Sequence, residues 1–274
     1  MRSASSTHAD DHTRKEYHLM DLGIHDHAFV VTGGSAGLGA ATARELLAGG
    51  AKVLLVGRSA ERLATITADL GGDSNTVATL AADLGDPETP REVMELATRR
   101  FGRLDGGLLS TGGPPPGLLL DSTDENWAEA YTSTFAGVVR MMRSLAQHLV
   151  DRDAPGSIAL VLSSSVHAPI PGLALSNGFR PGLAMLAKTL ADELGDNGIR
   201  VNSLLPGLIR TQRSEQVARR AGEEATRQRL SAIPLGRAGE PEEFGRIAAF
   251  LLSPAASYLN GVALPVDGGA RRGI

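Results

Sequence analysis

The residues with the clearest capacity for chemistry form a glycine-rich segment near the start of the chain. Thr32, Gly33, Gly37 and Gly39 are spaced T-G-x-x-x-G-x-G, directly after the apolar stretch 28–31. Glycines at this spacing allow a tight turn and let the backbone approach a pyrophosphate, which the free amides of a following helix then bind. A strand before the motif and a helix after it favour dinucleotide binding over the alternative, an ordinary glycine-rich turn.

A positive charge stands at the end of a second apolar run, 53–56, where Gly57, Arg58 and Ser59 follow. Dinucleotide folds that prefer NAD usually have a carboxylate at this point, which holds the hydroxyls of the adenosine ribose. Arg58 can instead pair with two oxygens of a 2′-phosphate, and Ser59 can assist it. The charge therefore favours NADP over NAD, and the alternative is a solvated arginine at a helix start.

Three consecutive serines, Ser163, Ser164 and Ser165, follow the apolar run 157–162. Open parallel sheets bind their ligands at the carboxyl ends of the strands, so these hydroxyls are candidates for a reaction site. His167 comes next but one, and an imidazole is a side chain that can exchange protons near neutral pH. The alternative for His167 is a partly exposed loop histidine without a catalytic role.

Short apolar runs must position these side chains. The runs lack polar alternation, as expected for strands that are covered on both faces. They are AFVV (28–31), VLLV (53–56), TVATL (76–80), GGLLS (106–110), SIALVL (157–162), IRVNSLL (199–205) and VALPV (262–266). Segments with helical spacing lie between them, such as Leu183, Leu186, Leu190 and Leu194. This alternation predicts an α/β fold of the Rossmann type, a doubly wound parallel sheet in three α/β/α layers, with one dinucleotide-binding domain over residues 27–274.

The composition excludes several classes of function. The chain contains no Cys, which excludes disulfides, thiolate metal sites and a cysteine nucleophile. The net charge of −4 is spread along the chain, so we expect no nucleic-acid partner. No apolar run approaches the ~20 residues of a membrane span, and the N-terminal stretch lacks the apolar core of a signal peptide. We therefore expect a cytoplasmic protein that does not bind membranes.

Histidines gather in the N-terminal stretch, where His8, His12, His18, His25 and His27 lie among Ser, Thr and Asp. Their spacing fits no metal-ligand motif, and no second cluster supports them. We predict a poorly ordered extension over residues 1–26 and no metal site, and a metal-binding arm is the alternative.

From Ala28 to Gly269 the sequence resembles the short-chain dehydrogenase/reductases. The likeness includes the glycine motif, STGGPPPG at 110–117 and the closing stretch IPLGRAGEPEEFGRIAAFLLSPAASYLNGVALPVDGG. Asp83 resembles the family's adenine-contacting aspartate, and Pro206-Gly207 with Thr211 resembles the segment that holds the nicotinamide amide. The motif and the resemblance together predict cofactor contacts from Thr32, Gly33, Ser35, Gly37, Leu38, Gly39, Arg58, Ser59, Asp83, Leu84, Thr111, Gly112, Gly113, Arg180, Pro206, Gly207 and Thr211.

The catalytic pattern departs from that of the family. Its members normally use an Asn that supports a water relay, a Ser that orients the substrate, a Tyr that exchanges the proton, and a Lys that lowers the pKa of the Tyr. Here these positions fall on Thr134, on Ser164 or Ser165, on Ser176 and on Arg180. A serine hydroxyl is a far poorer proton donor than a phenol. Arg180 stays protonated, so it can hold ribose hydroxyls or an oxyanion but cannot shuttle protons.

Two functions follow as hypotheses. The first is an NADP(H)-dependent carbonyl reductase or alcohol dehydrogenase that acts on a small molecule through a non-standard site, which could include His167. The second is a non-redox lyase, cyclase or isomerase, or a ligand-binding regulator, on the same fold. The segment PIPGLALSN resembles a divergent subgroup, similar to 3-oxoacyl-carrier-protein reductases, that lacks the four usual residues. The intact nucleotide motif favours the first hypothesis. The resemblance also implies a homo-oligomer, a tetramer or a dimer, built from the long helices around 124–150 and 178–196.

Overall fold

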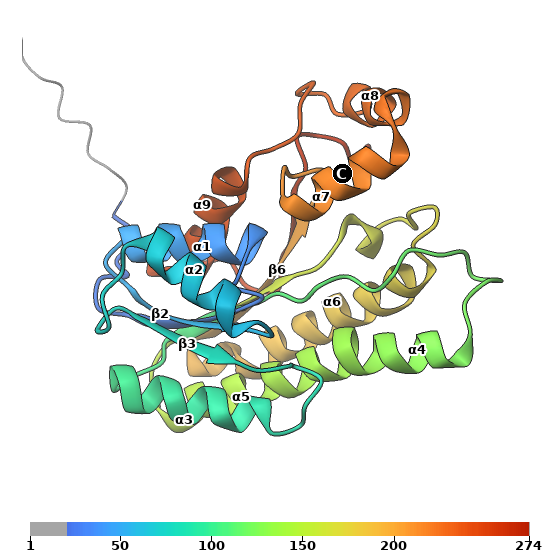
Figure 1. The fold of residues 1–274 in the computed structure, drawn as a ribbon. Helices are drawn as coiled ribbons and strands as arrows, with labels where there is room; N and C mark the ends of the chain where they lie inside the picture. The colour runs from blue at the N-terminus through green and yellow to red at the C-terminus, as the bar shows by residue number, and fades with distance from the viewer. Residues whose placement is uncertain (1–20, 274) are drawn as a thin grey trace, which may run out of the picture.

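Seven parallel strands form one sheet at the centre of the computed structural model, which describes residues 21–273. The strand order is β3-β2-β1-β4-β5-β6-β7 (Figure 1). The strands are β1 (Ala28–Thr32), β2 (Lys52–Gly57), β3 (Val77–Ala81), β4 (Gly106–Leu109), β5 (Gly156–Val161), β6 (Ile199–Pro206) and β7 (Ala263–Val266). Each apolar run that was predicted to be a strand forms one, with ends that differ by one residue at most.

Helices cover both faces of the sheet (Figure 1). One layer contains α1 (Gly37–Ala48), α2 (Ala60–Leu70) and α9 (Pro241–Leu252), and the other contains α3 (Thr89–Phe101), α5 (Gly137–Asp151) and α6 (Ala174–Leu194). After β6, α7 (Gln212–Ala221) and α8 (Glu223–Ser231) extend away from the sheet. The predicted Rossmann-type fold, doubly wound and in three layers, is confirmed.

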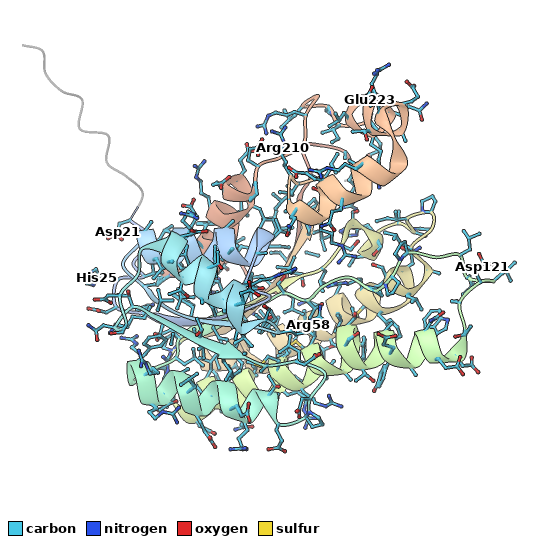
Figure 2. All side chains as sticks on the ribbon, in the orientation of Figure 1. Asp21, His25, Arg58, Asp121, Arg210 and Glu223 are labelled. Atoms are coloured by element: carbon cyan, nitrogen blue, oxygen red, sulfur yellow. The ribbon has the colours of Figure 1, made fainter. Side chains whose placement is uncertain are left out.

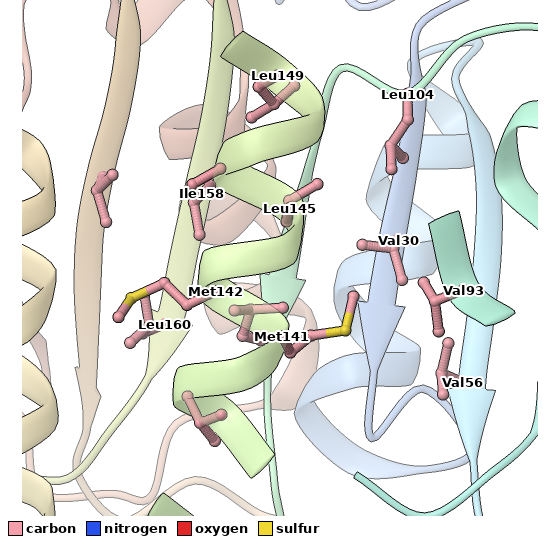
Figure 3. Packing of buried hydrophobic residues seen from close by; sticks show 14 of the residues in the cluster. Val30, Val56, Val93, Leu104, Met141, Met142, Leu145, Leu149, Ile158 and Leu160 are labelled. Atoms are coloured by element: carbon pink, nitrogen blue, oxygen red, sulfur yellow. The ribbon is translucent and has the colours of Figure 1, made fainter. Parts of the chain in front are cut away.

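The side chains of β1 alternate between two hydrophobic clusters. Val30 belongs to the cluster under α3, α5 and α6, whereas Phe29 and Val31 belong to the cluster under α1 and α9. Figure 3 shows the first cluster, in which Met141 and Leu145 of α5 lie against the strands. Because both faces of the strand are buried, no position is left for a polar side chain, and the sequence shows a continuous apolar run.

Charged residues join the amino ends of β1 and β4. Asp105, which is 4% exposed, accepts hydrogen bonds from the Ala28 amide at 2.8 Å and from Arg103 Nε at 2.7 Å. It also pairs with Arg152 Nη1, from the end of α5. Burial alone would raise the pKa of Asp105, but the hydrogen bonds from Arg103, Ala28 and Arg152 outweigh burial and lower it. We call Arg103, Asp105 and Arg152 the ionic cluster.

The folded part of the chain begins before residue 27, because Ile24 is buried in the α1 and α9 layer. Residues 1–20 and Ile274 lie outside the described residues, and with them most of the predicted extension, including His8, His12 and His18. Within residues 21–273, no group of three or more His, Cys, Asp or Glu side chains gathers as a metal site would require. None of the described helices is both long enough and apolar enough to cross a membrane.

Candidate functional site

The glycine motif forms the turn between β1 and α1. Gly33 has a φ of +60°, and a Cβ at this residue would lie 2.8 Å from the Ser110 carbonyl oxygen. A Cβ at Gly39 would lie 2.4 Å from the Gly33 carbonyl oxygen, so only glycine lets α1 pack this closely on the turn. Thr32 fixes the end of the strand, because its hydroxyl donates to the Ser110 carbonyl and accepts from the Ser110 amide, both at 2.8 Å.

The amino end of α1 is free to bind an anion. The residue that precedes it, Ala36, makes no side-chain cap, and the first turn has no acidic residue. In contrast, α2 is capped by Ser59, which accepts from the Arg62 amide at 3.3 Å. The first amides of a helix lack partners within the helix, so those of α1 can donate to a diphosphate. The turn and the helix therefore fit the dinucleotide that the sequence predicts, and the half-buried Ser35 and Leu38 lie within this segment.

Arg58 is exposed where β2 ends and α2 begins, as Figure 2 shows. Its guanidinium has no ion-pair partner among the residues that the structure describes. Ser59 is occupied as the cap of α2, which limits what its hydroxyl can offer a ligand. The side chain of Ser35 lies beside Gly57, since a Cβ there would be 3.2 Å from Ser35 Oγ. The end of β2 therefore presents a single unpaired cation next to the glycine turn.

The remaining predicted cofactor contacts also lie at the carboxyl edge of the sheet. Asp83 follows β3, is exposed, and accepts from the Gly85 amide at 2.9 Å. Leu84, the next residue, is half-buried against α5. Thr211 caps α7, and a Cβ at Gly37 would lie 3.5 Å from its side chain, so the start of α7 lies beside the start of α1. The same edge carries Thr111, Gly112 and Gly113 after β4, and Pro206 and Gly207 at the end of β6.

Two of the predicted catalytic hydroxyls lie side by side. Ser165 Oγ is 3.5 Å from Ser176 Oγ, and both serines are buried. Ser165 lies in the short 3₁₀ helix η2 (Ser164–Val166) after β5, and Ser176 lies in the first turn of α6. Of the two alternatives for the family's serine, Ser165 is therefore the one in contact with Ser176. Ser164 begins η2 and is half-buried.

Thr134, which the resemblance aligns with the family's Asn, is buried in a π-helical segment, η1 (Tyr131–Ala136). This segment interrupts one long helix between α4 (Asp124–Ala130) and α5. η1 packs on the first half of α6, with the rings of Phe135 and Phe179 5.8 Å apart. π-helical turns are rare and are often found at functional sites, because they shift the side chains of one turn relative to the next.

Arg180 is the most unusual group of the site. It is 5% exposed, and its Nη1 donates to the Val161 carbonyl at 2.7 Å while Nη2 lies 3.4 Å from the Thr111 hydroxyl. No carboxylate in the described part of the chain pairs with it. Burial, and then the charge of Arg213, lower the pKa of Arg180 to about 10. The guanidinium therefore remains a cation at neutral pH, held between the ends of β4 and β5.

His167 lies just after η2 and is exposed, and its backbone amide donates to the Ser164 carbonyl. Its imidazole makes no hydrogen bond within the described part of the chain. The structure thus brings Ser165, Ser176 and Arg180 close together, whereas His167 is exposed at the end of η2. Its catalytic role stays a prediction.

Sequence reasoning missed two residues. Asn177 binds the loop before α6 at both ends of its side-chain amide, accepting from the Ile170 amide at 3.0 Å and donating to the Ile170 carbonyl at 2.9 Å. Arg213, at the start of α7, donates to the Gly113 carbonyl at 3.3 Å. Asn177 gave no clear signal in the sequence, because it lies within α6 and bonds to Ile170, seven residues earlier. Arg213 gave none, since its partner lies far away in the sequence.

Comparison with known proteins agrees with this architecture. A family model described as Enoyl-(Acyl carrier protein) reductase matches residues 33–271. A probable 2,4-dienoyl-CoA reductase of Bacillus subtilis is 31% identical over 244 residues, which cover 88% of this chain and 95% of the relative.

Two solved structures add to the comparison. An L-sorbose reductase from Gluconobacter frateurii, complexed with NADPH and L-sorbose, is 30% identical with a TM-score of 0.84, covering 93% of this chain and 100% of that one. A short-chain oxidoreductase from Pseudomonas aeruginosa, described as containing an atypical catalytic center, is also 30% identical with a TM-score of 0.84, covering 92% and 100%.

The chain belongs to the short-chain dehydrogenase/reductase family of oxidoreductases. The names of these relatives describe redox enzymes, and they give no support to the non-redox alternative.

Proposed function

We propose that the chain reduces the carbonyl group of a small molecule with NADPH, and oxidises the corresponding alcohol in reverse, through a serine pair and a buried arginine. The observation that carries the proposal is the burial of Arg180. This cation is 5% exposed and has no carboxylate partner among the residues that the structure describes. A buried charge without a partner costs several kcal/mol. The fold therefore retains Arg180 at a cost to stability, as expected for a group that acts on a ligand.

The chain's own residues would hold the dinucleotide in three places. The free amides of α1 would bind the diphosphate, Arg58 would pair with a 2′-phosphate, and Arg180 would hold the hydroxyls of the nicotinamide ribose. When bound, NADPH supplies the hydride that the carbonyl carbon receives. The L-sorbose reductase complexed with NADPH supports this choice of cofactor.

Reduction also requires a proton at the carbonyl oxygen, which becomes the alcohol O–H. We assign this proton to the Ser176 hydroxyl, and Ser165, 3.5 Å away, would return a proton to it from water. Negative charge grows on the carbonyl oxygen as the hydride arrives, and the fixed charge of Arg180 would stabilise it. Because serine is a weaker acid than tyrosine, we expect turnover to be slower than with a phenol.

The test is to incubate the purified protein with NADPH and a panel of aldehydes, ketones and oxo acids, following the absorbance of NADPH. We expect measurable oxidation with at least one class, and a large loss of rate in Arg180→Ala. His167→Ala is run in parallel, since a large drop in its rate at unchanged NADPH affinity would assign the proton to His167 instead. Dinucleotide binding without turnover on any carbonyl would favour the non-redox alternative, and no dinucleotide binding at all would refute the proposal.

A further inference from the structure

Arg213 lies directly on the loop that follows β4. Its Nη2 donates to the Gly113 carbonyl oxygen at 3.3 Å, and a Cβ at Gly113 would come within 3.0 Å of Nη2 and 3.4 Å of Cζ. A side chain at residue 113 would therefore push the guanidinium away. Glycine at this position serves the approach of Arg213 as well as the predicted approach of a cofactor.

A second guanidinium reaches the same loop from the opposite element. Arg180 of α6 has its Nη2 3.4 Å from the Thr111 hydroxyl, so the segment 111–113 is in contact with two cations. The charge of Arg213 contributes to the lowered pKa of Arg180, which means that the two groups are close enough to repel each other. Like charges held together in this way are unfavourable unless an anion is bound between or beside them.

Two arginines near Arg213 have carboxylate partners, whereas Arg213 has none among the residues that the structure describes. Arg210 pairs with Glu240 at 3.1 Å, and Arg219, on the same helix, lies 3.9 Å from Glu215. Over residues 21–273, neither Arg213 nor Arg180 has a carboxylate partner. Of Arg210, Arg213 and Arg219, the one without a carboxylate partner in the described part of the chain is therefore Arg213, which contacts the β4 loop.

We propose that the substrate carries an anionic group, a carboxylate or a phosphate, close to the carbonyl that is reduced, and that Arg213 binds this group next to Arg180. This inference rests on the proposed function, because it names the substrate class of that site. A guanidinium matches the two oxygens of either anion with parallel N–H donors. The anion would also relieve the repulsion between the two arginines, so the site would bind a charged substrate better than its neutral analogue.

The same chemistry could come from the diphosphate of the dinucleotide. The start of α7 lies beside the start of α1, where the free amides fit that diphosphate, so Arg213 is within the region that a bound cofactor would cross. The experiment must therefore separate an anion on the substrate from an anion on the cofactor.

The experiment compares matched pairs of substrates, a panel of 2- and 3-oxo acids and their methyl esters, on the wild type, Arg213→Gln and Arg219→Gln. We expect Arg213→Gln to lower kcat/KM for the acid ~10–100-fold more than for its ester. Its Kd for NADPH, measured by calorimetry, should stay within about twofold of the wild type. Arg219→Gln removes a cation from the same helix and should match the wild type in both measurements. Thermal unfolding of each variant verifies that it is folded.

Two results would overturn the inference. An equal loss for acid and ester together with weaker NADPH binding would assign Arg213 to the cofactor diphosphate, and no loss for either substrate would leave it without an anionic partner.

A direct binding measurement tests the inference even if no carbonyl compound is reduced and the proposed function fails. The complex with NADP⁺ is titrated with malonate and, separately, with inorganic phosphate. Binding that is lost in Arg213→Gln and kept in Arg219→Gln supports the anion site. Absent binding, or binding that Arg213→Gln leaves unchanged, refutes it.

Discussion

The sequence resemblance aligns Arg180 and Ser176 with the family's Lys and Tyr, and on this alignment the exchange alters which of the two residues can move a proton. In the pattern, the ammonium lowers the pKa of the phenol, so the phenol is both donor and acceptor. Here the guanidinium remains charged, and in the proposed mechanism the hydroxyl of Ser176 would depend on Ser165, 3.5 Å away, to renew its proton. The positive charge of the site is kept, whereas its acid is weakened.

Arg58 decides the choice of cofactor if it binds the 2′-phosphate. We expect NADPH to bind at least about tenfold more tightly than NADH, a difference of ~1.4 kcal/mol. Arg58→Asp should reverse or abolish this preference, because a carboxylate repels the phosphate and accepts from ribose hydroxyls. Calorimetric titration of both variants with both cofactors measures it. Equal affinities of the wild type for NADPH and NADH would contradict the assignment.

Restoring the family's residues should restore its chemistry. In the double variant Ser176→Tyr with Arg180→Lys, a phenol stands beside an ammonium, and general acid catalysis of this kind is typically worth ~10²–10⁴-fold. We expect a gain in carbonyl reduction of that order, measured as kcat with NADPH. The control is Ser176→Phe with Arg180→Lys, which has a ring of similar size but no hydroxyl. A gain shared by both variants would show that the phenol is not its cause.

For individual residues, the sequence predicted which side chains belong to the candidate site better than it predicted the contacts between them. The spacing of the glycines was enough to predict the turn at Gly33 and Gly37, because that constraint is local to the backbone. The sequence could not distinguish Ser164 from Ser165, because the two are adjacent residues of the same type. The structure distinguishes them, since Ser165 is the one whose hydroxyl lies next to Ser176. Arg213 could not be predicted, because its contact with Gly113 joins elements from different parts of the chain.

Among the elements, the junction of β1 with α1 is the one on which cofactor binding depends. Gly37 has a φ of +55°, and a Cβ at this residue would lie 3.5 Å from the side chain of Thr211, between the start of α1 and the start of α7. Gly37→Val should abolish dinucleotide binding, because a branched side chain would occupy the place of the pyrophosphate. Fluorescence titration with NADPH measures the loss.

The matched control is Gly71→Val, at the end of α2. Gly71 has a φ of +66°, and a Cβ at this residue would have no heavy atom within 4 Å. The control therefore loses the same ~1–2 kcal/mol of stability, because a valine is placed in a left-handed backbone conformation, but it does not alter the glycine turn. Gly71→Val should be destabilised and still bind NADPH. Normal binding by Gly37→Val would show that the turn does not hold the pyrophosphate.

The strands were easier to predict than the helices that carry the site. A strand buried on both faces requires an apolar run, so each of the seven could be located within one residue. The π-helical turn at Thr134 leaves no such mark, because the residues around it are also compatible with a continuous α-helix. Helix α8 has no buried residue, so the hydrophobic periodicity that reveals a packed helix is absent there.

For the molecule as a whole, stability depends on the ionic cluster. Asp105→Asn would leave Arg103 and Arg152 without their carboxylate, and we expect a loss of about 2–4 kcal/mol in the free energy of unfolding, since both arginines keep contact with solvent. Urea denaturation at about pH 7 measures it. Asp151→Asn, which alters an exposed carboxylate nearby, should change the stability little.

The same variant has a predictable pH dependence. The pKa of Asp105 is lowered in the folded state, so its contribution is present above the unfolded value of ~3.9 and is lost as the pH falls through the folded value. The difference between wild type and Asp105→Asn should therefore shrink below about pH 4. A difference that stays constant down to about pH 3 would mean that the carboxylate is not the stabilising group.

Assembly is the other property of the whole molecule. The family resemblance implies a homo-oligomer, a tetramer or a dimer, built on the long helices, and Met185 of α6 and Tyr131 of η1 are 68% and 50% exposed. Met185→Glu should lower the mass measured by light scattering, because it would place a charge in an apolar interface. Thr65→Glu, on the exposed face of α2 in the other layer, is the control. A wild type that elutes as a monomer would rule out this assembly.

The ionic cluster joins the amino ends of the strands, and the serines and Arg180 lie at the opposite edge of the sheet. Strands of 4 to 8 residues separate the two edges by ~13–26 Å. Substitutions so far apart, with no shared partner, act on stability almost independently. Substitutions of the groups that transfer the proton are therefore expected to leave the stability contributed by the ionic cluster unchanged. By the same logic, a mutant library confined to the carboxyl edge would sample new reactions among variants that still fold.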